Sequence, residues 1–140
     1  MKKTKIFIVI IIIFIGIVFI WLNVRNQKPF EKLTKEEIKE VTIELYPPGA
    51  TAELDKEEIE ELVEILHQVV IYKKDNTYSD YCGQAVIYKI TKNDDTTIEV
   101  QAYNPFLIID GIGYTTKYEP CQKLNSLGNK WCKLLNMECD

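Results

Sequence analysis

QAVIYKITKNDDTTIEVQAY, residues 84–103, contains two runs rich in β-branched and aromatic residues on either side of a polar turn. In the second run apolar residues alternate with polar ones, a pattern typical of a strand that buries one face. The turn at 92–95 is short and contains Asn and Asp, which favour chain reversal. The segment therefore predicts an antiparallel hairpin with strands at 84–91 and 96–103.

A second hairpin and a helix are predicted downstream. Runs at 106–109 and 112–116 flank Asp110-Gly111, which suits a two-residue loop because glycine adopts a positive φ easily. Pro120 favours the first turn of a C-terminal helix. One side of that helix is apolar: Leu124, Leu127, Trp131, Leu134 and Leu135.

Upstream of the hairpins the pattern predicts a strand, a helix and another strand. Residues 41–46 alternate between apolar and polar side chains and end at Pro47-Pro48-Gly49. Asp55, with a glutamate three residues later, forms a capping box and begins a helix that we expect to end near His67. A strand at 69–72 follows. The apolar stripe of the helix has helical spacing: Ile59, Leu62, Val63, Leu66 and Val70.

Together these elements predict an α+β domain at residues 41–140, with an antiparallel sheet of about five to six strands and two main helices packed mostly on one face. Residues 26–40 are predicted to form a stalk with a short helix begun by Thr34 and Glu37. The expected core joins the helices to one face of the sheet: Ile59, Leu62, Val63, Leu66, Val41, Ile43, Leu45, Ile98, Val100, Trp131 and Leu135.

The N-terminus contains the most hydrophobic run of the chain. Residues 6–22 read IFIVIIIIFIGIVFIWL, with no charge, and span roughly 25 Å as a helix. Trp21 suits the membrane interface. A cleaved signal peptide is the alternative, but the run is long and no small-x-small cleavage site follows it. We therefore predict that residues 1–25 are a cytoplasmic tip and an uncleaved transmembrane signal anchor.

Lysines and cysteines predict the orientation of this anchor. Three lysines precede the hydrophobic run, which favours a cytoplasmic N-terminus. All four cysteines lie in the domain, and an even number without metal-binding spacing favours an oxidising exterior. We expect the disulfides Cys82–Cys121 and Cys132–Cys139. The alternative pairing, Cys82–Cys132 with Cys121–Cys139, requires a break in the last helix.

The charge of the domain excludes one class of partner. From Asn26 onward the chain carries 13 basic and 21 acidic residues, a formal charge of −8. A domain of this charge is repelled by phosphate backbones, so we expect no nucleic-acid partner. The expected partners are the membrane, through residues 6–22, and a protein or a cell-envelope component.

No residue pattern predicts catalysis, a cofactor or a metal. His67 is the only histidine. The only arginine is Arg25, which we expect to lie at the membrane interface. Cysteine transpeptidases of the sortase type need a Cys, a His and an Arg, and this domain lacks the arginine. No Cys-x-x-Cys pair is present for redox chemistry. An envelope-acting enzyme that uses Cys82 and His67 is an alternative hypothesis that the sequence does not favour.

Tyrosines and strand polar residues form the candidate interaction surface. Tyr is common on recognition surfaces because it combines a large contact area with a polar tip. The alternative is that these tyrosines are ordinary strand residues half-covered by their neighbours. The candidate residues lie on polar strand faces or before Cys82: Tyr46, Tyr78, Tyr81, Glu99, Gln101 and Tyr103, with Thr42 and Glu44 beside them.

The whole chain, with its Lys-rich start, Ile-rich anchor and short acidic domain, resembles small single-pass cell-envelope proteins of low-GC Gram-positive bacteria. The resemblance implies an extracytoplasmic setting and carries over no functional residue. We therefore expect a membrane-tethered extracytoplasmic binding module. A structural subunit of a membrane complex is a further alternative, although the anchor lacks a small-xxx-small pattern for helix pairing.

Overall fold

The computed structural model describes residues 2–23, 26–46 and 49–134, with side chains described for 6–18, 26–46 and 49–131. The helices are α1 (Lys2–Asn23), α2 (Lys56–His67) and α3 (Tyr118–Leu134), with 3₁₀ turns η1 (Lys35–Glu37) and η2 (Thr77–Asp80). The strands are β1 (Ile38–Tyr46), β2 (Ala50–Glu53), β3 (Ile71–Lys74), β4 (Ala85–Lys92), β5 (Thr97–Tyr103), β6 (Phe106–Ile109) and β7 (Ile112–Thr116).

The predicted α+β class with an antiparallel sheet is confirmed, but the predicted number of strands was wrong. Within the described residues the sheet has seven strands in the order β2-β1-β4-β5-β6-β7-β3. The additional strand is β2, which returns along β1 after Gly49, where φ is +87°. Its four residues, Ala-Thr-Ala-Glu, alternate, but the signal is weak because alanine and glutamate are uncommon in strands. The strand expected at 69–72 is β3 at Ile71–Lys74, because Val69 instead turns into the core.

Both predicted hairpins are confirmed. β4 and β5 pair from Val86↔Ala102 to Thr91↔Thr97, and β6 and β7 pair from Phe106↔Thr115 to Ile109↔Ile112. The loop between β6 and β7 is Asp110-Gly111, with φ of 49° and 79°. Two consecutive positive φ values match the right-handed twist of the flanking strands, which explains the preference for this dipeptide.

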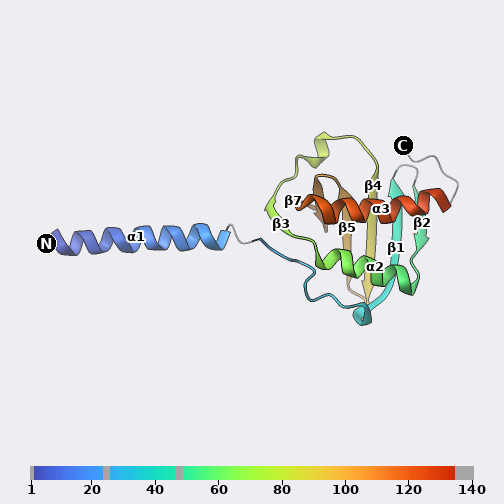
Figure 1. The fold of residues 1–140 in the computed structure, drawn as a ribbon, viewed down its shortest axis with the longest axis horizontal. Coiled ribbons are helices and arrows are strands. Elements are labelled where there is room, and N and C mark those ends of the chain that lie inside the picture. The colour runs from blue at the N-terminus through green and yellow to red at the C-terminus, as the bar shows by residue number, and fades with distance from the viewer. Residues whose placement is uncertain (1, 24–25, 47–48, 135–140) are drawn as a thin grey trace.

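Helices α2 and α3 lie side by side on one face of the sheet (Figure 1). The core between the two layers contains the predicted Leu62, Leu66 and Val100, all completely buried. Val63 is buried outside this cluster, at a hollow shared with Thr34 and Lys35, and Leu135 lies outside the described residues. The core also contains Tyr88, Ile65, Leu107, Leu124 and Leu127.

Helix α2 begins as its sequence predicts. The Glu58 backbone N–H donates to the Asp55 carboxylate and the Asp55 N–H donates to the Glu58 carboxylate, both at 2.9 Å. These bonds satisfy donors that the first helical turn cannot pair internally. The predicted start at Thr34 produces only the single turn η1, in which the Thr34 N–H donates to Glu37 Oε2 at 3.3 Å.

The second face of the sheet is partly covered by the chain between β3 and β4. Residues 75–83, which we call the strap, cross β6 and β7 on this face. The ring centroids of Tyr78 and Tyr81 lie 6.4 Å and 5.7 Å from that of Phe106. Phe106 and its neighbour Ile108 are therefore buried even though no helix lies over them.

Helix α1 stands apart from the domain (Figure 1). Its large apolar side chains from Ile6 to Val18 are 38–67% exposed. Among the residues that the structure describes, no helix reaches the combined length and hydropathy of a membrane span. The expected interfacial contacts of Trp21 and Arg25 fall outside the described side chains.

Candidate functional site

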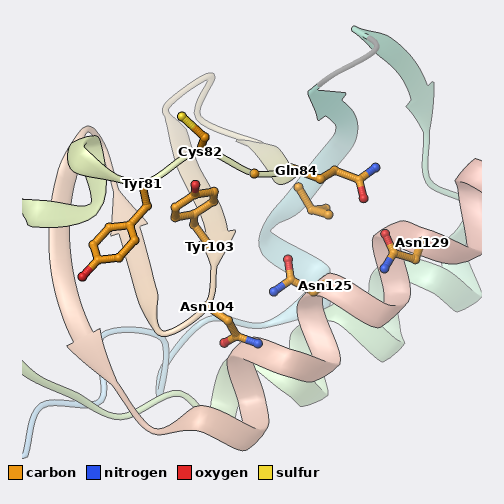
Figure 2. Close-up of a pocket in the computed structure, with 9 residues that line it drawn as sticks. Tyr81, Cys82, Gln84, Tyr103, Asn104, Asn125 and Asn129 are labelled. Atoms are coloured by element: carbon orange, nitrogen blue, oxygen red, sulfur yellow. The ribbon is translucent and has the colours of Figure 1, made fainter. Parts of the chain in front are cut away.

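A hollow of about 370 Å³ lies where β4 begins and β5 ends, against α3 (Figure 2). This volume lies within the range of about 300–1,000 Å³ typical of small-molecule sites. Three segments contribute its walls: the end of the strap with the start of β4, the turn after β5, and α3. The lining residues are Tyr81, Cys82, Gly83, Gln84, Val86, Tyr103, Asn104, Asn125 and Asn129.

Helix α3 supplies two amides from one of its faces. Asn125 and Asn129 are four residues apart, so they lie one helical turn from each other. In Figure 2 both project from α3 toward the loop that carries Gln84. Neither has a hydrogen-bond partner among the described residues. Both amides therefore face the hollow with donors and acceptors available.

Two contacts with β4 fix the position of α3. The buried Tyr88 hydroxyl donates to the Leu124 carbonyl at 2.6 Å. One turn later, Gly128 lies so close to Val86 that a Cβ would collide with both methyl groups of the valine. Glycine permits this approach of helix to strand, and the approach places Asn125 and Asn129 beside the start of β4.

The strap is held on β7 by the backbone of Gly113. Its carbonyl accepts from the Asp75 N–H at 2.8 Å, and its N–H donates to Asn76 Oδ1 at 2.9 Å. The Tyr78 hydroxyl donates to the Gly111 carbonyl at 3.4 Å. With the strap seated in this way, Tyr81 and Cys82 follow at the rim of the hollow.

Tyr103 and Asn104 form the wall beneath the strap. A Cβ at Gly83 would lie 3.3 Å from the Tyr103 hydroxyl oxygen, so the ring packs closely under this glycine. The next residue, Asn104, has a buried Oδ1 that accepts no hydrogen bond among the described residues. Buried acceptors are normally paired, so this oxygen marks a place where a donor is missing.

The hollow has an unusual chemical character because no Lys, Arg, Asp, Glu or His lines it among the residues that the structure describes. Recognition of a carboxylate or phosphate normally uses a cation, and recognition of an amine uses a carboxylate. Amide and hydroxyl groups, in contrast, both donate and accept. The arrangement therefore suits an uncharged polar ligand.

The structure places the predicted interaction residues in two groups. The first group lies on the uncovered face of the sheet and consists of Thr42, Glu44, Glu99 and Gln101. The strand register places them together. Thr42 and Glu99 both pair with Lys89, and Glu44 and Gln101 both pair with Ile87. Tyr46 lies at the end of the same face and is 61% exposed.

The remaining predicted tyrosines belong to the strap and the hollow. Tyr81 and Tyr103 both line the hollow, and Tyr81 is 60% exposed. Tyr78 is half-buried between Phe106 and Gly113. Tyr78 therefore fits better as an ordinary tyrosine that is half-covered by its neighbours, since its ring packs against Phe106 and Gly113.

The predicted Cys82–Cys121 disulfide was wrong, because both residues are free thiols. Cys121 lies in the first turns of α3, is buried, and its Sγ donates to the Phe106 carbonyl at 3.2 Å. Cys82 is exposed at the rim of the hollow, from which Cys121 is absent. The Cys132 side chain and Cys139 lie outside the described residues, as do the pairings that involve them.

The structure does not bring Cys82 and His67 together. His67 ends α2, and its Nε2 lies 2.7 Å from the Leu33 carbonyl, next to the hollow shared with η1. Cys82 lies in the hollow at the start of β4. Among the described residues, no group of three or more His, Cys, Asp or Glu side chains could hold a metal.

Sequence reasoning missed the amides of the hollow. Asn125 and Asn129 have helical spacing on the predicted C-terminal helix, which was a usable signal. The interpretation of that helix considered only its apolar side. Asn104 carried no signal of its own, since Asn-Pro is common in turns.

The fold and the hollow together define the class of molecule: a single antiparallel sheet covered by two helices, with an uncharged polar hollow at one end. No protein-family model matches the chain, and neither the curated proteins nor the solved structures include a match.

Proposed function

We propose that this chain is a membrane-tethered binding module whose α+β domain lies outside the cytoplasm. The observation that carries the proposal is the hollow, whose described lining carries no charged side chain and no paired nucleophile and base. Nucleophilic catalysis needs a base within hydrogen-bond reach of the nucleophile, and Cys82 and His67 line separate hollows. Reversible binding of a protein or an envelope component is the activity that this arrangement supports.

The exposure of α1 supports the tether. A helix that is apolar on every side needs an apolar environment, and the domain does not cover its side chains. Contiguous exposed apolar surface of this extent is typical of a membrane contact. The uncharged run at 6–22 spans roughly 25 Å, which is close to a hydrocarbon core of about 30 Å.

The orientation rests on the charged residues before α1's apolar run. Lys2, Lys3 and Lys5 precede it, and lysines accumulate on the cytoplasmic side of membrane spans. The cysteines lend less support to an exterior location than the sequence suggested, because the two that are described are free thiols.

Labelling of Cys82 in intact cells tests both the tether and the orientation. Cys82 is exposed, so a membrane-impermeant maleimide should modify it if the domain is outside. The modified Cys82 peptide should be found by mass spectrometry in the membrane fraction, and a Cys82→Ser variant is the matched control. Labelling only after lysis would overturn the orientation, and recovery of the chain in the soluble fraction would overturn the tether.

The binding role needs a separate test. Crosslinking in intact cells, followed by pull-down through a C-terminal tag, should recover one dominant envelope component. A variant with the uncovered face altered, Tyr46→Ala with Gln101→Ala, should recover less of it than the wild type. Lys117→Ala, an exposed substitution after β7, is the control for non-specific loss. If the wild type and both variants recover the same proteins and none of these is specific, the binding module is contradicted.

A further inference from the structure

We infer that the hollow at the start of β4 binds an uncharged carbohydrate ring. This assignment rests on the proposed binding function and names its ligand class. The starting observation is the lining, in which the described residues include two tyrosines, four amides and no charged side chain. Carbohydrate hydroxyls both donate and accept hydrogen bonds, as amide side chains do, so the amides of Asn125 and Asn129 can pair with neighbouring hydroxyls.

The walls offer the apolar contact that a sugar ring also needs. Tyr103 and Val86 line the hollow, together with Tyr81, whose ring packs on Phe106. Tyrosine combines a flat apolar surface with a polar tip, which suits a ligand with C–H groups on its faces and hydroxyls at its edge. Asn125 and Asn129 lie opposite, on α3 (Figure 2). A ring placed between Tyr103 and α3 meets aromatic surface on one side and hydrogen-bonding groups on the other.

Asn104 contributes less directly to the hollow. Its Oδ1 accepts no hydrogen bond among the described residues, but this oxygen is buried, so a ligand in the hollow does not reach it. The polar contacts of the ligand therefore come mainly from Asn125 and Asn129.

The size of the hollow suits one ring. Its volume of about 370 Å³ lies near the lower end of the range of about 300–1,000 Å³ typical of small-molecule sites, so it suits a small ligand such as one ring. A longer oligosaccharide would place one unit in the hollow and extend the others across the uncovered sheet face.

Peptide binding by strand addition is disfavoured by the sheet order. β4 and β5, which border the hollow, are paired on both sides: β4 with β1 and β5, and β5 with β4 and β6. Neither strand has a free edge at which an extended peptide could form backbone hydrogen bonds. The recognition groups in this hollow are side chains, which again suits a ring with hydroxyls.

Calorimetry on the full-length chain tests the assignment. The protein is held in a zwitterionic detergent, because detergents with sugar head groups would compete. The probes are maltotriose and the trimer of N-acetylglucosamine, with glucuronic acid as an anionic probe and an uncharged tripeptide amide as a peptide probe. We expect at least one uncharged trisaccharide to bind, and both other probes to bind at least about tenfold more weakly.

Variants locate the binding. Asn125→Ala with Asn129→Ala should weaken trisaccharide binding by about tenfold or more, since two hydrogen-bonding groups are lost. Gln122→Ala, an exposed amide on the same helix outside the hollow, should leave the affinity unchanged. The bound sugar should also slow alkylation of Cys82 at the rim. Unchanged thermal unfolding of the double variant shows that lost binding is not lost folding.

Two outcomes overturn the assignment: tighter binding of the peptide or of glucuronic acid, or trisaccharide binding that the double variant does not weaken. If no sugar binds while crosslinking in cells still recovers a partner, the carbohydrate assignment fails and the binding module stands. If sugar binds in detergent but maleimide labelling places the domain inside the cell, the assignment stands and the proposed location fails.

Discussion

A methyl group at Gly113 would lie 2.6 Å from Cδ1 of Tyr78, closer than any stable carbon contact allows. The same methyl would strike the carbonyl oxygen of Asp75, which is backbone and cannot move by rotation. Gly113 also binds the strap through its own N–H and carbonyl. One glycine on β7 therefore permits the strap to lie flat on the second face of the sheet.

Substitution of Gly113 by Ala should displace the strap and destabilise the domain by about 1–3 kcal/mol, the typical cost of an overpacked site. Denaturant unfolding measures the loss. Gly83→Ala is the matched control, because its Cβ meets only the end of the Tyr103 side chain at 3.3 Å. Its cost should stay within about 0.5 kcal/mol. Equal stability of both variants would contradict the seating of the strap on Gly113.

Leu62 should contribute far more to stability than Thr97. Leu62 is completely buried between α2 and the sheet, so Leu62→Ala should cost about 2–5 kcal/mol through lost burial and a residual cavity. Thr97 is exposed on β5, and Thr97→Ala should cost well under about 1 kcal/mol. Similar midpoint shifts in urea would mean that the two layers are assigned incorrectly.

Tyr88 should make the stability fall at alkaline pH. Burial, and next the negative charge of Glu61, raise the pKa of the Tyr88 hydroxyl far above its ordinary value. In the unfolded chain this hydroxyl ionises at a pH of about 10. Its contribution is therefore fully present below that pH and is lost progressively as the pH rises above it, because only the unfolded state then releases the proton.

Comparison with Tyr88→Phe isolates this effect. The variant loses the bond to the Leu124 carbonyl and should be about 0.5–1.5 kcal/mol less stable at pH 7. The difference in unfolding free energy between wild type and variant should shrink above a pH of about 10. If the difference in unfolding free energy stays constant up to a pH of about 11, the Tyr88 hydroxyl is not buried in the way that the structure shows.

The two described thiols should differ in reactivity. Burial raises the pKa of the Cys121 thiol to about 11, so little of the reactive thiolate is present at neutral pH. Iodoacetamide should modify the exposed Cys82 in the native protein and reach Cys121 only after denaturation. Peptide mapping by mass spectrometry distinguishes the two. Native labelling of Cys121 at the rate of Cys82 would contradict the packing of α3 on the Phe106 carbonyl.

Much of the fold was predictable because local patterns determined it. The alternation in β5, the Asp110-Gly111 loop and the capping box at Asp55 each depend on residues close together in the chain. β2 was missed because its short alternation, Ala-Thr-Ala-Glu, uses residues that are uncommon in strands, and the segment becomes a strand by pairing with β1. Tyr88 was not predicted to lie in the core, although it pairs with Ile43 on the helix-covered face.

The hollow was less predictable than the fold because its walls come from three distant segments. Tyr81 and Tyr103 were singled out from composition, and both line it. Asn125 and Asn129 were overlooked, and the expected Cys82–Cys121 bridge is absent because both thiols are free. Cys121 instead turns its thiol to the Phe106 carbonyl.

The sequence by itself determined the elements and their faces, since helical and strand periods are properties of neighbouring residues. It also determined the acidic charge of the domain and the apolar character of the N-terminal run. Only the tertiary structure decided that the strap covers part of the second face and that β5, α3 and the start of β4 line a hollow without charged side chains among the described residues. The physical reason is that these contacts depend on close approaches at Gly113 and Gly128. The sequence shows that both residues lack a Cβ, but only the structure shows whether a Cβ there would meet open space or a packed neighbour.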